Sequence, residues 1–203
     1  KFVRITTAAR ALIARKGFEA RTAREICERA EIGTGTLFLY VRDKRELLFL
    51  CFEADARRLF AEGRAEALRT DGLVPQLLCL FRRFIDYYAG DPALSKAIVR
   101  ELFFRPHDPE GIGRLTREYS EHVAELVIAA QARSEIRADV SAELAAMAFY
   151  AHYAFWILGW LGTGMLSAES VEPGLRQALE LQLDGLAARR ADGSRSWQAI
   201  GLA

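Results

Sequence analysis

Residues 21–47, RTAREICERAEIGTGTLFLYVRDKREL, decide the fold of this 203-residue chain. Thr22 followed by Glu25 has the spacing of a capping box, in which a hydroxyl and a carboxylate bond backbone amides at the start of a helix. This spacing predicts a short helix over 23–30, and the three residues after it allow only a tight turn. A second short helix is expected over 34–40, and a third begins at 43 or 44. Two short helices across such a turn form a helix-turn-helix, whose second helix can enter the major groove of DNA.

This stretch and the helix before it resemble the TetR family of bacterial transcriptional regulators. The residues that carry the resemblance, in the family's order and spacing, are Ile5, Ala8, Ala9, Leu12, Ile13, Gly17, Phe18, Thr22, Arg24, Ile26, Ala30, Ile32, Gly35, Thr36, Leu37, Tyr40, Lys44 and Leu47. The rest of the chain fits the family in length and helical content. The resemblance implies an all-α fold. An N-terminal three-helix helix-turn-helix DNA-binding domain would span 1–46, and a C-terminal helical ligand-binding and dimerisation domain would span 47–190, before a loose tail over 191–203.

The resemblance also implies which residues meet DNA. The positions that match the family's phosphate contacts are Thr22, Thr36, Tyr40 and Lys44. The positions that would face base edges are Arg24, Thr34, Gly35 and Leu39. Arg24 can bond a guanine in bidentate fashion, whereas Leu39 offers only apolar contact, such as with a thymine methyl. The alternative for Arg24 is a solvated surface side chain.

Three positions depart from the family's pattern. Gly33 lies where a helix-capping serine is usual, and glycine is a tolerated cap that lacks the side-chain bond. Phe38 replaces a common tyrosine, so a phosphate-contacting hydroxyl is gone, and Leu39 lies where many relatives carry a polar residue. These departures affect the details of DNA contact and leave the motif intact.

Charge is distributed unevenly along the chain. Residues 1–46 contain eleven Lys and Arg against six Asp and Glu, a charge of +5, while the remainder has 17 against 21, a charge of −4. A basic N-terminal unit on an acidic body is typical of a protein that binds DNA with one end. The alternative is a randomly uneven surface.

No set of residues in the sequence indicates catalysis or metal binding. Cys27, Cys51 and Cys79 are odd in number and widely spaced, which favours a reducing, cytoplasmic compartment, and no secretory signal precedes the first helix. The histidines, His107, His122 and His152, fall on separate predicted elements, and no glycine-rich phosphate loop follows a strand. We therefore expect neither an enzyme nor a metal or cofactor.

The body reads as a series of helices. A long helix over 47–68 should connect the DNA-binding unit to the body, and Asp71-Gly72 ends it. Helices are then expected over about 73–89, from Pro92, up to Arg133, over 141–161 and over 173–190, with a loop around Pro106 and Pro109. Residues 144–166 contain no charge and are long enough to cross a bilayer. Their acidic flanks supply no basic anchor, so the favoured interpretation is a helix buried between its own core and a second subunit, with no membrane span.

An aromatic stripe at helical spacing lies on the same stretch, at Phe149, Tyr153, Trp156 and Trp160, with His152 beside it. One interpretation is packing in the core or the dimer interface, and the other is the wall of a ligand cavity. The full set of candidate effector-pocket residues is Phe84, Tyr88, Tyr119, His122, Phe149, His152, Tyr153 and Trp156.

These observations predict a homodimeric transcriptional regulator. It would repress from a pseudo-palindromic double-stranded DNA operator until a small apolar or aromatic effector releases it. Two alternatives remain open: a DNA-binding dimer without a small-molecule effector, and a helical binding or enzyme domain whose first helices merely resemble the motif.

Overall fold

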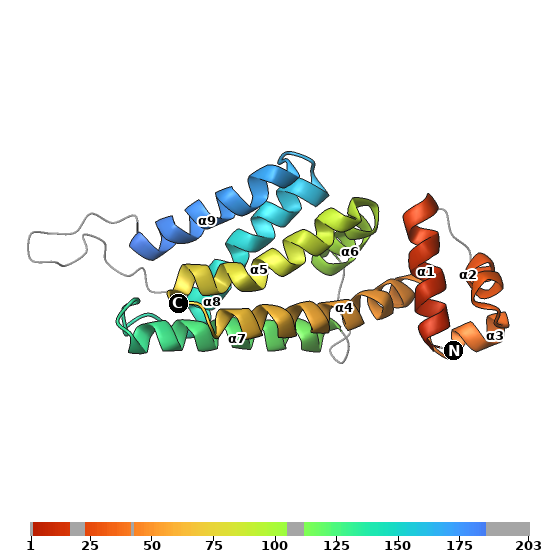
Figure 1. Ribbon diagram of the computed structural model, residues 1–203, viewed down its shortest axis with the longest axis horizontal. Helices are drawn as coiled ribbons and strands as arrows, with labels where there is room; N and C mark the ends of the chain where they lie inside the picture. Colours follow the sequence, from red (N-terminus) through yellow and green to blue (C-terminus); the bar gives the residue numbers. More distant parts are fainter. Residues whose placement is uncertain (1, 17–22, 42, 105–111, 186–203) are drawn as a thin grey trace, which may run out of the picture.

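The computed structural model describes residues 2–16, 23–41, 43–104 and 112–185, and within these ranges it contains helices and no strand (Figure 1). The helices are α1 Phe2–Lys16, α2 Ala23–Ala30, α3 Thr34–Phe38, α4 Lys44–Ala67, α5 Leu73–Gly90, α6 Pro92–Phe104, α7 Ile112–Ala132, α8 Ala142–Ile157, the π-helical turn η1 Leu158–Gly162, and α9 Ala168–Asp184. Helices α1 to α3 form a head at one end of the molecule, and α4 runs from the head into a bundle of the remaining helices (Figure 1). The all-α prediction is confirmed.

The head has its own small core. Its buried cluster combines Ile5 of α1, Ile26 of α2, Leu37 of α3 and Leu47 of α4, each at most 3% exposed. The predicted bounds of α2 match the structure, and α3 ends two residues earlier than expected. Thr22, the first half of the proposed capping box, lies outside the described residues.

Helix α4 belongs to both parts of the molecule. Asp43 caps its N-terminus by accepting a hydrogen bond from the Glu46 amide at 2.7 Å. Leu47 is buried in the core of the head, whereas Leu48 and Phe52 are buried in the core of the body. Because a helix rises about 1.5 Å per residue, these 24 residues span roughly 36 Å without a break.

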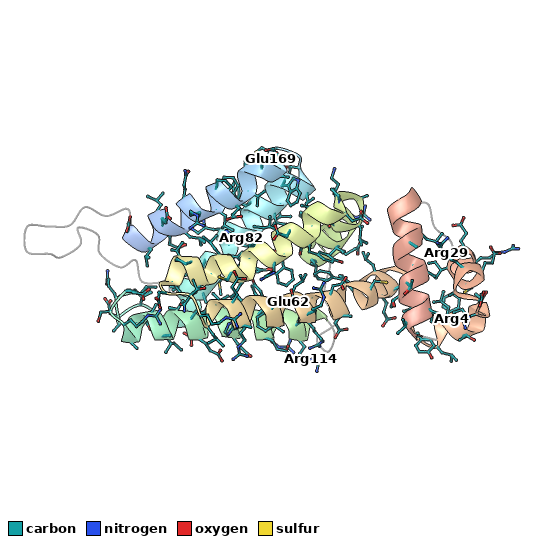
Figure 2. All side chains as sticks on the ribbon, viewed as in Figure 1. Arg4, Arg29, Glu62, Arg82, Arg114 and Glu169 are labelled. Carbon is teal, nitrogen blue, oxygen red and sulfur yellow. The ribbon has the colours of Figure 1, made fainter. Side chains whose placement is uncertain are left out.

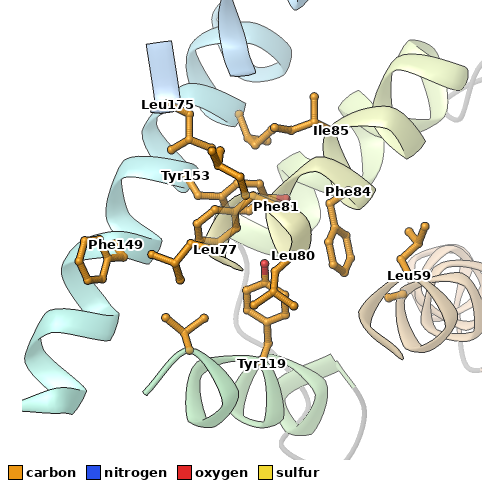
Figure 3. Packing of buried hydrophobic residues seen from close by; sticks show 14 of the residues in the cluster. Leu59, Leu77, Leu80, Phe81, Phe84, Ile85, Tyr119, Phe149, Tyr153 and Leu175 are labelled. Carbon is orange, nitrogen blue, oxygen red and sulfur yellow. The ribbon is translucent and has the colours of Figure 1, made fainter. Parts of the chain in front are cut away.

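The body is a bundle around aromatic and leucine side chains. Helix α5 supplies its centre, with Leu77, Leu80 and Phe81 fully buried, and α4, α7, α8 and α9 pack around it (Figure 3). Phe81 stacks on Tyr153 of α8 with ring centroids 4.7 Å apart. These contacts place several aromatic rings between α4, α5, α7 and α8.

One predicted helix start in the body is wrong, and one predicted helix changes type near its end. The expected start of the last helix at Pro173 takes proline for a first-turn residue, but α9 begins at Ala168 and holds Pro173 inside. The missing amide of Pro173 would have bonded the carbonyl of Glu169, which is exposed and can bond water instead. The expected helix 141–161 changes at Leu158 into the π turn η1, where the Thr163 amide bonds the Leu158 carbonyl at 2.9 Å. The predicted loop at Pro106 and Pro109 and the tail 191–203 lie outside the described residues.

The apolar stretch Ala142–Gly162 is long and apolar enough to cross a membrane by composition alone. A single such helix is weak evidence, because core helices of water-soluble proteins pass the same test. Here one face of α8 packs on α7 and α9 and carries the buried Phe149, Tyr153 and Ile157.

Candidate nucleic-acid interface and ligand cavity

The turn of the helix-turn-helix is fixed from two sides. Glu31 adopts a left-handed backbone conformation with φ of 52°, which lets the Ile32 amide bond the Cys27 carbonyl at 3.0 Å and closes α2. Arg4 of α1, which Figure 2 labels in the head, donates through Nε to the Ala30 carbonyl at 2.9 Å and through its guanidinium to the Glu31 carbonyl at 2.7 Å. These bonds satisfy carbonyls at the end of α2 and hold the turn against α1.

Helix α3 presents an open face to solvent. Thr34 and Gly35 are exposed, and a Cβ added to Gly35 would meet nothing within 4 Å. Beyond them Phe38 is 53% exposed and Leu39 is 84% exposed, although both are large and apolar. Leu37, on the opposite side of the helix, is 1% exposed and anchors α3 in the core. The exposed side of α3 can therefore approach a partner closely.

The other proposed DNA contacts lie around this face. Arg24 projects from α2 with its side chain 84% exposed, and its Nε donates to Oε1 of Glu28 at 2.9 Å. Thr36 is half-buried and Tyr40 is 40% exposed. Lys44 is the first residue of α4, but its side chain, like all of Thr22, lies outside the described residues. The ion pair of Arg24 with Glu28 is exposed and therefore weak, so it can exchange for a bond to a base.

The body contains a cavity of about 230 Å³ next to α4. Its lining residues are Phe52, Ala56, Phe84, Tyr88, Leu102, Phe103, Leu115, Thr116, Tyr119, Tyr150 and Tyr153. Four of the proposed effector residues, Phe84, Tyr88, Tyr119 and Tyr153, meet in this wall. The wall is almost entirely aromatic and aliphatic, as in pockets that hold small apolar molecules.

The structure places the other four proposed effector residues outside the cavity lining. His122 is 4% exposed beside the cavity, where its Nδ1 lies 2.9 Å from Oε2 of Glu125 and its ring meets the edge of Phe60. Phe149 faces a separate surface hollow between the loop after α7 and the end of α9. Trp156 lies against Gly174 of α9, and His152 is half-buried on α8. One side of α8 thus faces the cavity, while Trp156 packs α8 on α9.

The tyrosine hydroxyls give the cavity its polar character. Burial raises the pKa of Tyr88, Tyr119, Tyr150 and Tyr153 above the ordinary value, so all four stay neutral at any physiological pH. The interaction between the Tyr88 and Tyr153 hydroxyls opposes part of the pKa rise at Tyr88 and adds to the pKa rise at Tyr153.

Several residues that line the cavity were not among those predicted from the sequence. Phe52 and Ala56 follow each other at i, i+4 on α4, a signal that fits ordinary core packing equally well. Tyr150 precedes Tyr153 by one helical turn, so the aromatic stripe on α8 could have been extended to it. Leu102 and Phe103 at the end of α6 carry no periodic signal that separates a cavity wall from the core.

Four charged residues tie α4 to α7 beside the cavity. Glu53 accepts from Arg57 at 2.8 Å along α4 and lies 3.9 Å from Arg114 of α7. Glu118 of α7 lies 3.6 Å from Arg57 and 4.0 Å from Arg114. Each helix contributes one positive and one negative side chain, and opposite charges face each other across the two helices. The cluster therefore favours one relative position of α4 and α7.

The outer side of α8 carries an apolar stripe. Leu144, Met147, Ala151 and Phe155 are all exposed and fall on one face of the helix. Leu181 of α9 is 54% exposed as well. Water-soluble monomers rarely expose a continuous apolar surface of this kind, so the stripe is a candidate interface with another protein chain.

Comparison with known proteins agrees with this arrangement. Residues 5–51 match the sequence model of the family described as bacterial regulatory proteins, tetR family. The HTH-type transcriptional repressor KstR of Rhodococcus jostii (strain RHA1) is 28% identical over 101 residues, which are 50% of this chain and 47% of the relative. The chain thus matches about half the length of that curated protein.

Two solved structures share the fold over nearly the whole chain. Thermus thermophilus FadR, a TetR-family transcriptional repressor in complex with lauroyl-CoA, has a TM-score of 0.74 at 24% identity, covering 94% of this chain and 97% of its own. The regulator FadR of Bacillus subtilis in complex with stearoyl-CoA has a TM-score of 0.73 at 17% identity, covering 88% and 97%.

Proposed function

We propose that this chain, which belongs to the tetR family of bacterial regulatory proteins, is a transcriptional repressor that a small apolar ligand releases from its DNA operator. The main support for the proposal is that α4 extends from the DNA-binding head to the cavity. Its first turn packs into the helix-turn-helix head, and Phe52 and Ala56 farther along form part of the cavity wall. A ligand in the cavity therefore touches the helix that holds the DNA-binding head.

In this proposal α3 is the helix that enters the major groove. Its exposed side brings Thr34, Gly35 and Leu39 to base edges, and Arg24 reaches from α2. Thr22, Thr36, Tyr40 and Lys44 bond phosphates on either side. Such phosphate contacts set the register of the protein on DNA and make binding depend on salt.

Two copies of the chain bind one pseudo-palindromic operator. The apolar stripe on α8, with α9 beside it, packs against the same surface of a second subunit in a four-helix interface. A two-fold dimer places its two α3 helices on symmetric half-sites, so the spacing between the heads decides operator affinity.

The ligand acts by selecting one head spacing over the other. Phe52 lies eight residues from Lys44 on α4, roughly 12 Å along the axis, so a small tilt of α4 at the cavity moves the head. The ligand shifts this equilibrium only by its difference in affinity for the two positions. The FadR proteins similar in fold are complexes with lauroyl-CoA and stearoyl-CoA, which supports an apolar ligand for the cavity here.

A mobility-shift assay on DNA from upstream of the protein's own gene tests the proposal. The protein should bind that DNA as a dimer, with loss of affinity as salt rises. Failure to bind any double-stranded DNA specifically would refute it and favour a helical domain with a different role. Specific binding that no apolar compound in a thermal-shift screen affects would leave a DNA-binding dimer without an effector.

The proposal assigns the chain a regulatory role in the cytoplasm and no enzymatic one. Cys27, Cys51 and Cys79 are free thiols, in keeping with a reducing compartment. Among the described residues, no three His, Cys, Asp or Glu side chains come together in a way that could hold a metal ion.

A further inference from the structure

One buried hydroxyl in the cavity wall has no hydrogen-bond partner among the described residues. Tyr119 is 7% exposed, and its Oη is fully buried without a partner. Its ring rises from α7 toward α5, as Figure 3 shows, between Phe60, Phe84 and Tyr150, whose centroids lie 5.4, 5.6 and 6.1 Å away. A buried hydroxyl without a partner is unfavourable, so an acceptor that enters the cavity and reaches this oxygen would restore a hydrogen bond.

The described part of the cavity wall offers no charge to a ligand. Among the described residues that line it there is no Lys, Arg, Asp or Glu, and the charged cluster beside it is composed of residues already paired with one another. Burial keeps the tyrosines neutral. A charged group inside the cavity would thus lose its hydration without gaining a counter-ion, which is strongly unfavourable.

The size of the cavity limits the group that fills it. An apolar protein cavity of about 150 Å³ is known to bind benzene. At about 230 Å³ this cavity exceeds that size, which suits two fused rings or an aliphatic chain of similar volume.

We propose that the cavity takes an uncharged group of about this size with one hydrogen-bond acceptor, such as a carbonyl oxygen, and that the Tyr119 hydroxyl donates to that acceptor. The inference rests on the proposed function, because it names the chemical class of the effector for the same cavity. Any charged part of the natural ligand remains outside the cavity wall. Tyr119 is therefore the residue that distinguishes an oxygen-bearing ligand from a hydrocarbon of the same shape.

Three probes on one ring frame test this directly: tetralin, 1-tetralone and 1,2,3,4-tetrahydro-1-naphthoate. Calorimetric titration of the full chain gives the affinity of each for the wild type, for Tyr119→Phe and for Tyr153→Phe. The last variant removes a hydroxyl of the same cavity that already interacts with the Tyr88 hydroxyl, so it is the matched control.

We expect the preference for tetralone over tetralin to fall by about tenfold in Tyr119→Phe, as for the loss of one buried hydrogen bond. In Tyr153→Phe that preference should stay within about twofold, because no bond to the ketone is removed. The naphthoate should bind at least about a hundredfold more weakly than the ketone. An unchanged preference in Tyr119→Phe, a naphthoate that binds like the ketone, or no binding of any probe would overturn the inference.

A spectroscopic measurement on the wild type makes the test independent of the folding of the variant. The infrared carbonyl band of bound tetralone should lie below its position in an alkane solvent, because a hydrogen bond weakens the carbonyl bond. A band at the alkane position would refute the contact. Operator binding is measured separately in the mobility-shift assay. If the ligand tests fail while the protein still binds its operator, the ligand inference is refuted and the DNA-binding function is not.

Discussion

Replacing Phe155 by alanine should weaken the dimer more than any other single truncation on the outer side of α8. Phe155 is 54% exposed in the single chain, and it is the last residue of the apolar stripe, following Met147 and Ala151 along α8. A phenylalanine buries roughly 150–250 Å² when enclosed, so about 100 Å² of this side chain remain for a partner to cover.

The expected size of the effect follows from that area. At about 25 cal/mol per Å², covering the side chain contributes roughly 2 kcal/mol beyond the alanine that replaces it. Two-fold symmetry places two copies in the interface, so the upper value is about 4 kcal/mol, or roughly a thousandfold in the dissociation constant of the dimer.

Sedimentation equilibrium over a range of protein concentrations measures this constant for the wild type and the variant. Phe104→Ala is the control, since Phe104 is 67% exposed at the end of α6 and is not part of the stripe. Its dissociation constant should equal that of the wild type. A Phe155→Ala protein that dimerises as tightly as the wild type, or a wild type that stays monomeric at micromolar concentration, would show that the stripe is not the interface.

Three further changes test other parts of the structure. A Cβ at Gly174 would overlap Cη2 of Trp156, so Gly174→Ala should destabilise the fold by about 1–3 kcal/mol in chemical denaturation and shift the tryptophan fluorescence. Arg24→Ala should relax preference at one symmetric pair of operator positions, by about 1–3 kcal/mol, in binding assays on substituted operators; equal loss on operator and random DNA would contradict this. Arg133, and to a lesser degree the Leu73 amide, lowers the pKa of Glu135, so the carboxylate stabilises the fold above its ordinary pKa of 4.5 and loses this effect as pH falls through the folded value. Glu135→Gln should therefore cost about 1 kcal/mol at pH 7 and less at acid pH, and a penalty independent of pH would refute this.

Local signals in the sequence were sufficient to predict the head. Asp43 caps α4 where a helix start was expected, and the three residues after Ala30 form the tight turn. The bonds of Arg4 to the end of α2 were not predicted, because they join residues 26 and 27 positions apart and leave no periodic signal. Whether Arg24 and Lys44 contact DNA as proposed stays a prediction.

The sequence alone did not determine which aromatic residues of α8 face the cavity. Helical spacing places Phe149, His152, Tyr153 and Trp156 on one helix, but only the packing of α8 decides that Tyr153 faces the cavity and that Trp156 covers Gly174. Spacing along a helix reports which residues share a face and does not report which neighbour that face meets. The start of α9 was missed for a related reason, since Pro173 is tolerated inside a helix where its neighbouring carbonyl reaches solvent.

The continuous helix α4 also bears on attempts to build hybrid regulators from this chain. A junction after residue 46 would leave the head without Leu47 and Cys51, which are 3% and 2% exposed in its core. A junction after residue 52 would take Leu48 and Phe52 from the body. In a chimaera that joins the DNA-binding head of another regulator to this body, the residues of these two turns of α4 therefore have to be chosen one by one. Those that face the head come from the other regulator, and those that face the body come from this chain.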